Sequence, residues 1–419
     1  MPALQLRRPR ATAITAGIAG TIALTVTLAG CGAIGGLIPA LLDGGTVNTV
    51  GAIDFGNPLA IPPLAESTTD ADGRRVFDLA AQPGTTEFIP GRPADTWGFN
   101  QDYLGPTLVL NDGEDVAVQV HNELAEATTV HWHGMHLPAA MDGGPHHMVE
   151  PGETWSPEWT VDQDAATLWY HPHPHGETEK HVRNGLAGMV IVKDEAESAL
   201  PLPRHYGVDD FPLVVQDAQL DSQGRLDDSN KGFVGSLGDT VLVNGTTEPF
   251  LEVTTELVRL RILNASAARS YNFGFSDDRE FAMIASDGGL LESTLPTRAI
   301  QLSPGERAEL VVAFEPGETV VLRSTPPDLG IGDATAARNG GADSLDILEL
   351  RAAEVLAPSP ALPDKLVPVD RMTEADADTE RDFTLDGFVI NQEPMSMERI
   401  DEVVTVGDTE IWNVRNGMS

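Results

Sequence analysis

The stretch GEDVAVQVHNEL, residues 113–124, decides the fold because its pattern returns twice later in the chain. Valines stand at alternate positions, as in a β-strand that buries one face. The stretches TELVRLRILNAS (255–266) and GDTEIWNVRNGM (407–418) repeat this strand with an asparagine behind it. These three asparagines are spaced 142 and 152 residues apart, at Asn122, Asn264 and Asn416. A repeat of this length predicts three related domains rather than a solenoid.

Length and composition favour the same organisation. A chain of 419 residues is too long for one ordinary core, and 41% apolar residues with 41 glycines, 30 prolines and 5% aromatics are typical of a turn-rich β protein. We therefore predict an all-β fold with two complete domains and the first strands of a third. The expected ranges are 67–195 and 205–355 for the two domains, 356–380 for a Pro-rich and then acidic linker, and 381–419 for the third domain.

The net charge of −38 excludes nucleic acid as a partner, because no basic surface could act against that field. We interpret the charge as a solubilising surface, with attraction for cations as a secondary effect.

The first 31 residues predict export. Arg7, Arg8 and Arg10 precede an apolar run that ends at Cys31, as in a secretory signal. The ending Leu28-Ala29-Gly30-Cys31 resembles a bacterial lipobox, so we favour a lipoprotein signal over a plain signal peptide with a chance cysteine. The Arg7-Arg8 pair leaves the Sec and twin-arginine export routes both open. We expect a lipidated Cys31, a flexible tether over 32–66, and a protein anchored by lipid to the outer face of the cell membrane.

All eleven histidines lie between positions 121 and 205, and two groups among them suggest a metal site. In HWH, the side chains of His131 and His133 share one face of a strand while Trp132 takes the other. In HPHPH, the prolines favour an extended backbone that would align His171, His173 and His175. Neutral imidazole is a preferred ligand of copper and zinc. One such motif could arise by chance, but two within 45 residues favour a metal site.

The other histidines are not expected to be metal ligands. His121 is expected in a tail or turn at the surface, and His175 could donate or accept a hydrogen bond within the site. His136, His146 and His147 are expected in loops near the site, where they could support the ligands or face solvent. Ordinary structural roles are expected for His181 and His205.

From about residue 95 onward the chain resembles a multicopper oxidase of the bacterial copper-efflux and spore-coat laccase type. The resemblance rests on TVHWHG, MDGGPHH, WYHPHPHGETEKHVRNGLAGMVIV, RLRILNASAARSYNF, IASDGGLL and LSPGERAEL. It implies that each domain is a cupredoxin-like Greek-key sandwich. It also implies copper, and an activity that couples one-electron oxidation of a small reducing substrate (a phenol, an aromatic amine or a metal ion) to four-electron reduction of O₂ to water.

The resemblance also implies roles for single residues. His131 matches a ligand of the type 2 copper. His133, His171 and His173 match ligands of the type 3 pair. Asp142 matches an acidic residue that assists protonation of reduced oxygen, and the alternative is a turn residue before Gly143-Gly144.

The chain departs from the family beyond its second domain. The family uses eight histidines and a type 1 site with a cysteine, but no Cys or His occurs after His205 here. We expect a C-terminally truncated oxidase that is inactive alone and supplies half of the cluster ligands. Other hypotheses are a non-catalytic extracytoplasmic copper- or zinc-binding protein and a relative of the copper-free division proteins, which should lack these histidines. A zinc hydrolase is disfavoured because no nearby carboxylate completes its pattern. The oligomeric state stays open.

Overall fold

The computed structural model describes residues 46–227, 231–232 and 235–417, and almost all of its regular structure is β-strand. The all-β prediction is confirmed. The expected signal peptide, Cys31 and the first part of the expected tether lie outside the described residues. Of the helices in the described part of the chain, none is long and apolar enough to cross a membrane.

Two sheets form the part of the chain that carries the histidines, and their inner faces enclose a core that includes Trp132, Tyr170 and Val118. The strands of the first sheet are β2 (Ser67–Thr69), β3 (Arg75–Ile89), β4 (Arg92–Phe99), β6 (Asp115–Asn122), β8 (Thr154–Trp155) and β9 (Glu158–Thr160). The strands of the second are β5 (Leu108–Asn111), β11 (Gly188–Lys193), β10 (Ala166–His171) and β7 (His131–His133).

A second pair of sheets comes later in the chain, with its own large core. The strands of one sheet are β16 (Thr246–Thr247), β15 (Thr240–Val243), β12 (Asp210–Ala218), β18 (Leu257–Asn264), β23 (Arg307–Ala313), β20 (Phe281–Ser286) and β21 (Gly289–Thr297). The strands of the other are β1 (Asn57–Pro58), β17 (Pro249–Thr255), β25 (Leu345–Ala357), β24 (Thr319–Thr325), β19 (Tyr271–Phe275) and β22 (Ala299–Leu302).

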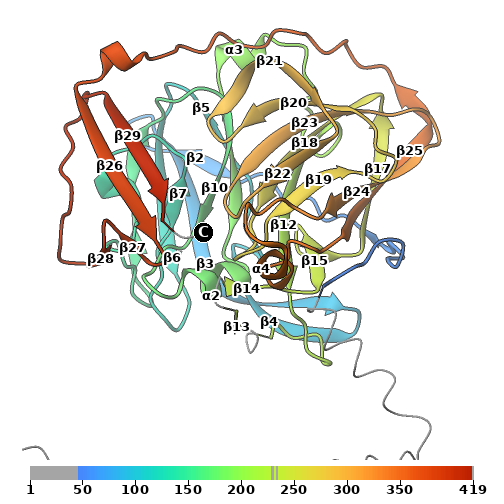
Figure 1. Cartoon of the computed structure of the whole chain (residues 1–419), viewed down its shortest axis with the longest axis horizontal. Helices are drawn as coiled ribbons and strands as arrows, with labels where there is room; N and C mark the ends of the chain where they lie inside the picture. Colours follow the sequence, from blue (N-terminus) through green and yellow to red (C-terminus); the bar gives the residue numbers. More distant parts are fainter. Residues whose placement is uncertain (1–45, 228–230, 233–234, 418–419) are drawn as a thin grey trace, which may run out of the picture. The chain divides into compact units, whose positions relative to one another are not determined.

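The remaining elements are short or lie near the end of the chain. The four-stranded sheet of β28 (Glu393–Pro394), β27 (Val389–Ile390), β26 (Thr379–Asp386) and β29 (Glu410–Asn416) is drawn in red in Figure 1. A small hairpin joins β13 (Lys231–Gly232) and β14 (Gly235–Ser236). The helices are η1 (Ala139–Met141), α2 (Thr178–Arg183), α3 (Glu195–Ser198), α4 (Asp333–Arg338) and η2 (Glu374–Asp376).

The repeat seen in the sequence has a structural counterpart. The strands β6, β18 and β29 are its three copies, and each pairs in parallel with an earlier strand, β3, β12 and β26 respectively. Asn122 and Asn264 are both buried and make equivalent bonds. Each Oδ1 accepts from the backbone N–H two residues on, and each Nδ2 donates to two backbone carbonyls. The asparagine therefore closes the same loop in both pairs of sheets.

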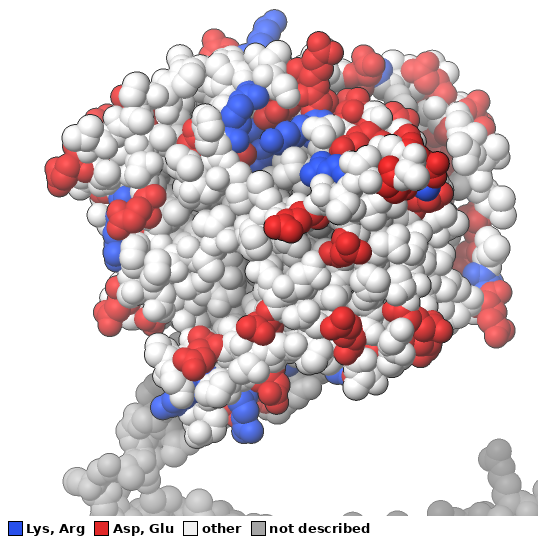
Figure 2. Space-filling model, turned by 180° about the vertical axis from the view of Figure 1, so that it is seen from behind, with Lys and Arg blue, Asp and Glu red and all other residues white. Residues whose placement is uncertain are grey.

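The two pairs of sheets pack together through a third apolar cluster. Trp169 of β10, Ile191 of β11, Val214 of β12 and Leu263 of β18 are buried in it. Residues 45–419 form one compact unit, so the division into separate domains stays a prediction even though the sheets follow the repeat. Acidic side chains are spread over the face of this unit that Figure 2 shows, with fewer basic side chains among them.

The expected flexible tether over 32–66 is wrong for its described part. Strand β1 adds to β17 in parallel, and Phe55 and Leu59 are buried. Apolar side chains of this segment reach the core of the second pair of sheets. The expected linker 356–380 also makes contacts, since Leu366 is buried against Ile284 and Val311.

Candidate metal centre

Two neighbouring strands place three histidines side by side. His131 and His133 lie on β7, which pairs antiparallel with β10, so that His131 is opposite His171 and His133 is opposite Trp169. Trp132 points to the other side and is buried in the core. The predicted alternation of HWH is therefore confirmed, and the register of two strands gathers imidazoles that are separated by 38 residues in the chain.

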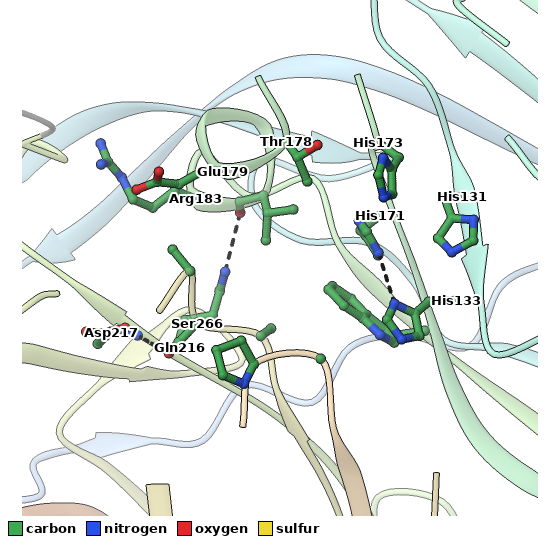
Figure 3. Close-up of a pocket in the computed structure, with 16 residues that line it drawn as sticks. His131, His133, His171, His173, Thr178, Glu179, Arg183, Gln216, Asp217 and Ser266 are labelled. Carbon is green, nitrogen blue, oxygen red and sulfur yellow. Dashed lines mark hydrogen bonds between the residues drawn. The ribbon is translucent and has the colours of Figure 1, made fainter. Parts of the chain in front are cut away.

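The imidazole nitrogens are close enough to share an ion. One nitrogen from each of His131, His133 and His171 lies within 4.8 Å of the other two. His133 Nδ1 and His171 Nε2 are 3.2 Å apart, within hydrogen-bond distance. The ring of His173 lies 5.5 Å from the ring of His131, between centroids, although its side chain is solvent-exposed. Figure 3 shows the four rings grouped at one end of a cavity.

Burial keeps two of these imidazoles neutral. It lowers the pKa of His133 to about 4, with a further contribution from the positive charge of Arg307. Burial also lowers the pKa of His171 well below its usual value, although the Pro172 carbonyl that accepts from its Nδ1–H opposes the shift. A neutral ring offers a lone pair to a metal, and a set of neutral imidazoles suits copper or zinc. The donor set therefore fits the copper that the resemblance implies.

Asp142 contacts His131 directly. Its carboxylate Oδ1 lies 3.2 Å from His131 Nδ1, and its own carbonyl oxygen lies 3.0 Å from the same atom. Burial would lower the pKa of His131, but these interactions raise it overall, and the pKa of Asp142 is lowered in return by its hydrogen bond with His131. Since Nδ1 is held by Asp142, Nε2 of His131 is left for a metal.

The loop after Asp142 is tightly constrained. Gly143 has φ +72°, and a Cβ at this position would lie 1.7 Å from the Val130 carbonyl oxygen. Only glycine fits here, so Asp142 is also the turn residue that the alternative interpretation described. Its contact with His131 shows that the two roles are compatible.

The HPHPH motif does not stay in the sheet. Strand β10 ends at His171, and the backbone N–H of His173 donates to Thr129 Oγ1 at 2.6 Å. His175 is exposed and makes no hydrogen bond with the described residues, so the structure does not bring it into the group. Proline has no N–H to donate, which explains why strand pairing stops where the prolines begin.

A half-buried polar network that the sequence did not reveal lies beside Thr129, around His181. His181 on α2 lies 2.9 Å from Glu126 and 3.0 Å from Thr128, and Lys180 donates to the same Glu126 carboxylate. The side chain of His181 is only 1% exposed. The spacing of these residues follows no strand or helix period, so no sequence pattern indicated that they meet.

The remaining histidines lie apart from the group. His121 is exposed and contacts Thr154, and His205 is exposed and contacts Asp209. His146 lies 2.9 Å from the Met397 carbonyl, and His147 stacks on Trp155. The backbone of His136 donates to Gln163.

The second pair of sheets forms part of the cavity beside the histidines. The cavity has a volume of about 410 Å³, and its lining includes the four imidazoles, Trp169, Asp217, Ser266 and Gly305. Trp169 stacks on His171 with 4.0 Å between ring centroids. In Figure 3 the histidines lie on one side, and Gln216, Asp217 and Ser266 on the other.

The sequence and the fold both resemble those of multicopper oxidases and related proteins. The profile of a family described as "Multicopper oxidase" matches residues 80–197. Among curated proteins, the chain is 37% identical over 369 residues to the "Cell division protein FtsP" of Escherichia coli (strain K12), covering 85% of this chain and 76% of that protein. It is 41% identical over 268 residues to the "Multicopper oxidase mco" of Staphylococcus haemolyticus, covering 64% and 60% of the two chains.

Two solved structures extend the comparison. A laccase from Pediococcus acidilactici Pa5930 superposes with a TM-score of 0.78 at 34% identity, covering 86% of this chain and 76% of the other. A laccase-like CueO from Ochrobactrum sp. gives 0.77 at 34% identity, covering 86% and 82%. The cupredoxin-like architecture expected from the sequence is shared with these proteins.

Proposed function

Since this chain belongs to the multicopper oxidase family, we propose that it binds copper through four histidines, His131, His133, His171 and His173. These four would be half of the ligands of the trinuclear copper site of a laccase-like oxidase. The proposed reaction couples one-electron oxidation of a phenolic, aromatic amine or metal-ion substrate to reduction of O₂ to water. The single observation that carries the proposal is the meeting of three imidazole nitrogens within 4.8 Å of one another.

The protein's own residues have defined tasks in this proposal. Asp142 orients His131 through Nδ1, and the Pro172 carbonyl orients His171 through Nδ1, so both rings would offer Nε2. Asp142 also keeps a carboxylate, and hence a proton acceptor, beside the imidazoles. Bound copper would supply the redox chemistry with O₂. Four imidazoles are half of the eight that the family uses, so oxidase activity needs ligands beyond those in this sequence.

The location of the protein is part of the proposal. The basic and apolar N-terminal residues followed by Cys31 support export and a lipid anchor on the outer face of the cell membrane. We propose O₂ and a small reducing substrate as its reaction partners, and no nucleic acid.

The experiment is a measurement of copper content and O₂ uptake on the same sample. The full protein is loaded with Cu(II), desalted and assayed for copper per chain and for O₂ consumption with a phenol and with Cu(I). His133→Ala should lose bound copper, whereas His205→Ala should keep it, because His205 is 76% exposed and pairs with Asp209 away from the group. Copper loss in both variants, or in neither, would contradict the proposed site.

A second candidate is a non-catalytic extracytoplasmic copper-binding protein. The same experiment separates it from the oxidase when the sample also holds the further ligands that the oxidase needs. The binding protein predicts about one ion per chain, dependent on His133, and no O₂ consumption even then. The similarity to FtsP over 369 residues favours a third outcome, a role in cell division without copper. In that case neither copper binding nor O₂ uptake would be found.

A further inference from the structure

The guanidinium of Arg307 crosses from the second pair of sheets to the strand that carries His171. Arg307 is the first residue of β23 and is only 4% exposed. Its Nε donates to the Thr167 carbonyl of β10 at 3.0 Å, while Nη2 donates to the Asp287 carbonyl at 2.9 Å and Nη1 to the Gly305 carbonyl at 3.1 Å. One side chain thus joins three backbone segments.

The hydrogen bond between Arg307 and Thr167 lies next to the end of β7. Strand β7 stops at His133, opposite Trp169, so Thr167 lies beyond the last strand pair. Gly134 then turns the chain away with φ +88°, and a Cβ on it would lie 2.7 Å from Arg307 Nη2. Arg307 therefore packs directly against the turn after His133.

The turn before Arg307 approaches the same histidine. Gly305 has φ +86°, and a Cβ there would lie 3.3 Å from His133 Cε1. The turn that carries Gly305 is held to Arg307 by the Nη1 bond, and to Asn264 by the Gly305 N–H, which donates to the Asn264 carbonyl. The space that His133 can occupy is thus limited by a segment more than 170 residues later in the chain.

We propose that Arg307 is a positioning residue that holds β10 and the Gly305 turn in place around the end of β7 and so sets the distance between His133 and His171. This inference rests on the proposed function in one respect, since it takes these imidazoles to be metal ligands. A guanidinium has no lone pair to offer, so Arg307 itself would not ligate a metal. Its planar fork of donors holds Thr167, Asp287 and Gly305 at once, which the single ammonium of lysine cannot do.

The substitution Arg307→Lys tests geometry without removing the charge. A positive charge near the imidazoles opposes binding of a cation, so loss of the charge alone would strengthen copper binding, whereas loss of the geometry would weaken it. The matched control is Arg269→Lys. Arg269 is 1% exposed and also holds several groups, namely Asp217, Asp343 and the Gly238 carbonyl, which belong to the second pair of sheets and the loops between its strands. Asp217 lines the same cavity, but on the side opposite the histidines (Figure 3).

The first readout is Cu(II) affinity by competition titration of the full protein, with the electron paramagnetic resonance spectrum of bound Cu(II). Arg307→Lys should bind copper about ten-fold more weakly, with altered spectral parameters, because supporting residues of metal ligands typically act on this scale. Arg269→Lys should keep the wild-type affinity and spectrum even if it unfolds more easily. Wild-type or stronger copper binding by Arg307→Lys, or equal weakening in both variants, would overturn the inference.

The second readout requires no copper. Hydrogen–deuterium exchange without added metal should become faster in residues 128–138 and 166–173 of Arg307→Lys and stay unchanged there in Arg269→Lys. If the wild-type protein binds no copper but these segments still loosen, the proposed function fails and the positioning of β7 stands. If their exchange is unchanged, Arg307 does not position the histidines, whatever the protein binds.

Discussion

His131 Nδ1 lies within reach of two oxygens of one residue, the Asp142 carboxylate at 3.2 Å and the Asp142 carbonyl at 3.0 Å. The carboxylate fixes the ring orientation and favours a proton on Nδ1. Asp142→Asn should therefore weaken Cu(II) binding about ten-fold while leaving the unfolding free energy nearly unchanged. A competition titration and urea unfolding measure the two quantities. The control Asp209→Asn, which changes the exposed contact with His205, should leave copper affinity as it is.

The loop that holds Asp142 should tolerate no side chain at position 143. Gly143→Ala places a Cβ 1.7 Å from the Val130 carbonyl in a left-handed backbone conformation, so we expect a loss of about 3 kcal/mol or more in unfolding free energy. Gly144→Ala is the control, because a Cβ there meets no atom within 4 Å. Equal stability of the two variants in urea would show that the loop adjusts freely.

The hydroxyl of Thr129 should matter for His173. Thr129→Val removes the acceptor of the His173 backbone N–H and should cost about 1–3 kcal/mol of unfolding free energy. The loop should then hold His173 less well, so copper binding should weaken as well. The control is Thr86→Val, which removes a hydroxyl contact between Thr86 on β3 and Thr96 on β4, away from the histidines. It should leave copper binding unchanged. Calorimetry with and without Cu(II) would measure both effects.

Stability should depend on pH through Glu309. Burial would raise the pKa of this carboxyl, but Arg259 and Arg261 outweigh it and lower the pKa from 4.5 to about 2. A lowered pKa stabilises the folded state above the unfolded value, and this stability is lost as the pH falls from about 4.5 toward 2. At neutral pH Glu309→Gln should lose about 3–5 kcal/mol, because two buried guanidinium groups lose a carboxylate.

The measurement for Glu309 is urea unfolding between pH 2 and pH 7. The difference between wild type and Glu309→Gln should shrink as the pH falls through this window. The exposed Glu315 provides the control, and Glu315→Gln should keep nearly the wild-type stability at neutral pH. A constant difference for Glu309→Gln would contradict the assignment.

The local part of the site could be predicted from sequence, because a strand alternates with period two. That rule alone placed His131 and His133 on one face and Trp132 on the other. The same rule failed at HPHPH, because strand pairing ends at the first proline and His175 does not lie with the other histidines. Arg307 and His181 were not predicted as part of the site's surroundings, because their contacts join segments that no local period relates.

The flexible tether expected over residues 32–66 is, for its described residues, the part of the prediction that failed. Phe55 and Leu59 are buried, and β1 extends a sheet. Strand addition at a sheet edge depends on which edge is free, and that information lies in β17, nearly 200 residues away.

The shared bonds of Asn122 and Asn264 have a consequence for how the protein matures. The second pair of sheets closes its loop with the same asparagine bonds as the first, yet no histidine occurs after position 205. The architecture therefore does not depend on the imidazoles. On the proposed function, the chain would fold before copper binds, so that copper supply, rather than folding, would determine when the site is filled.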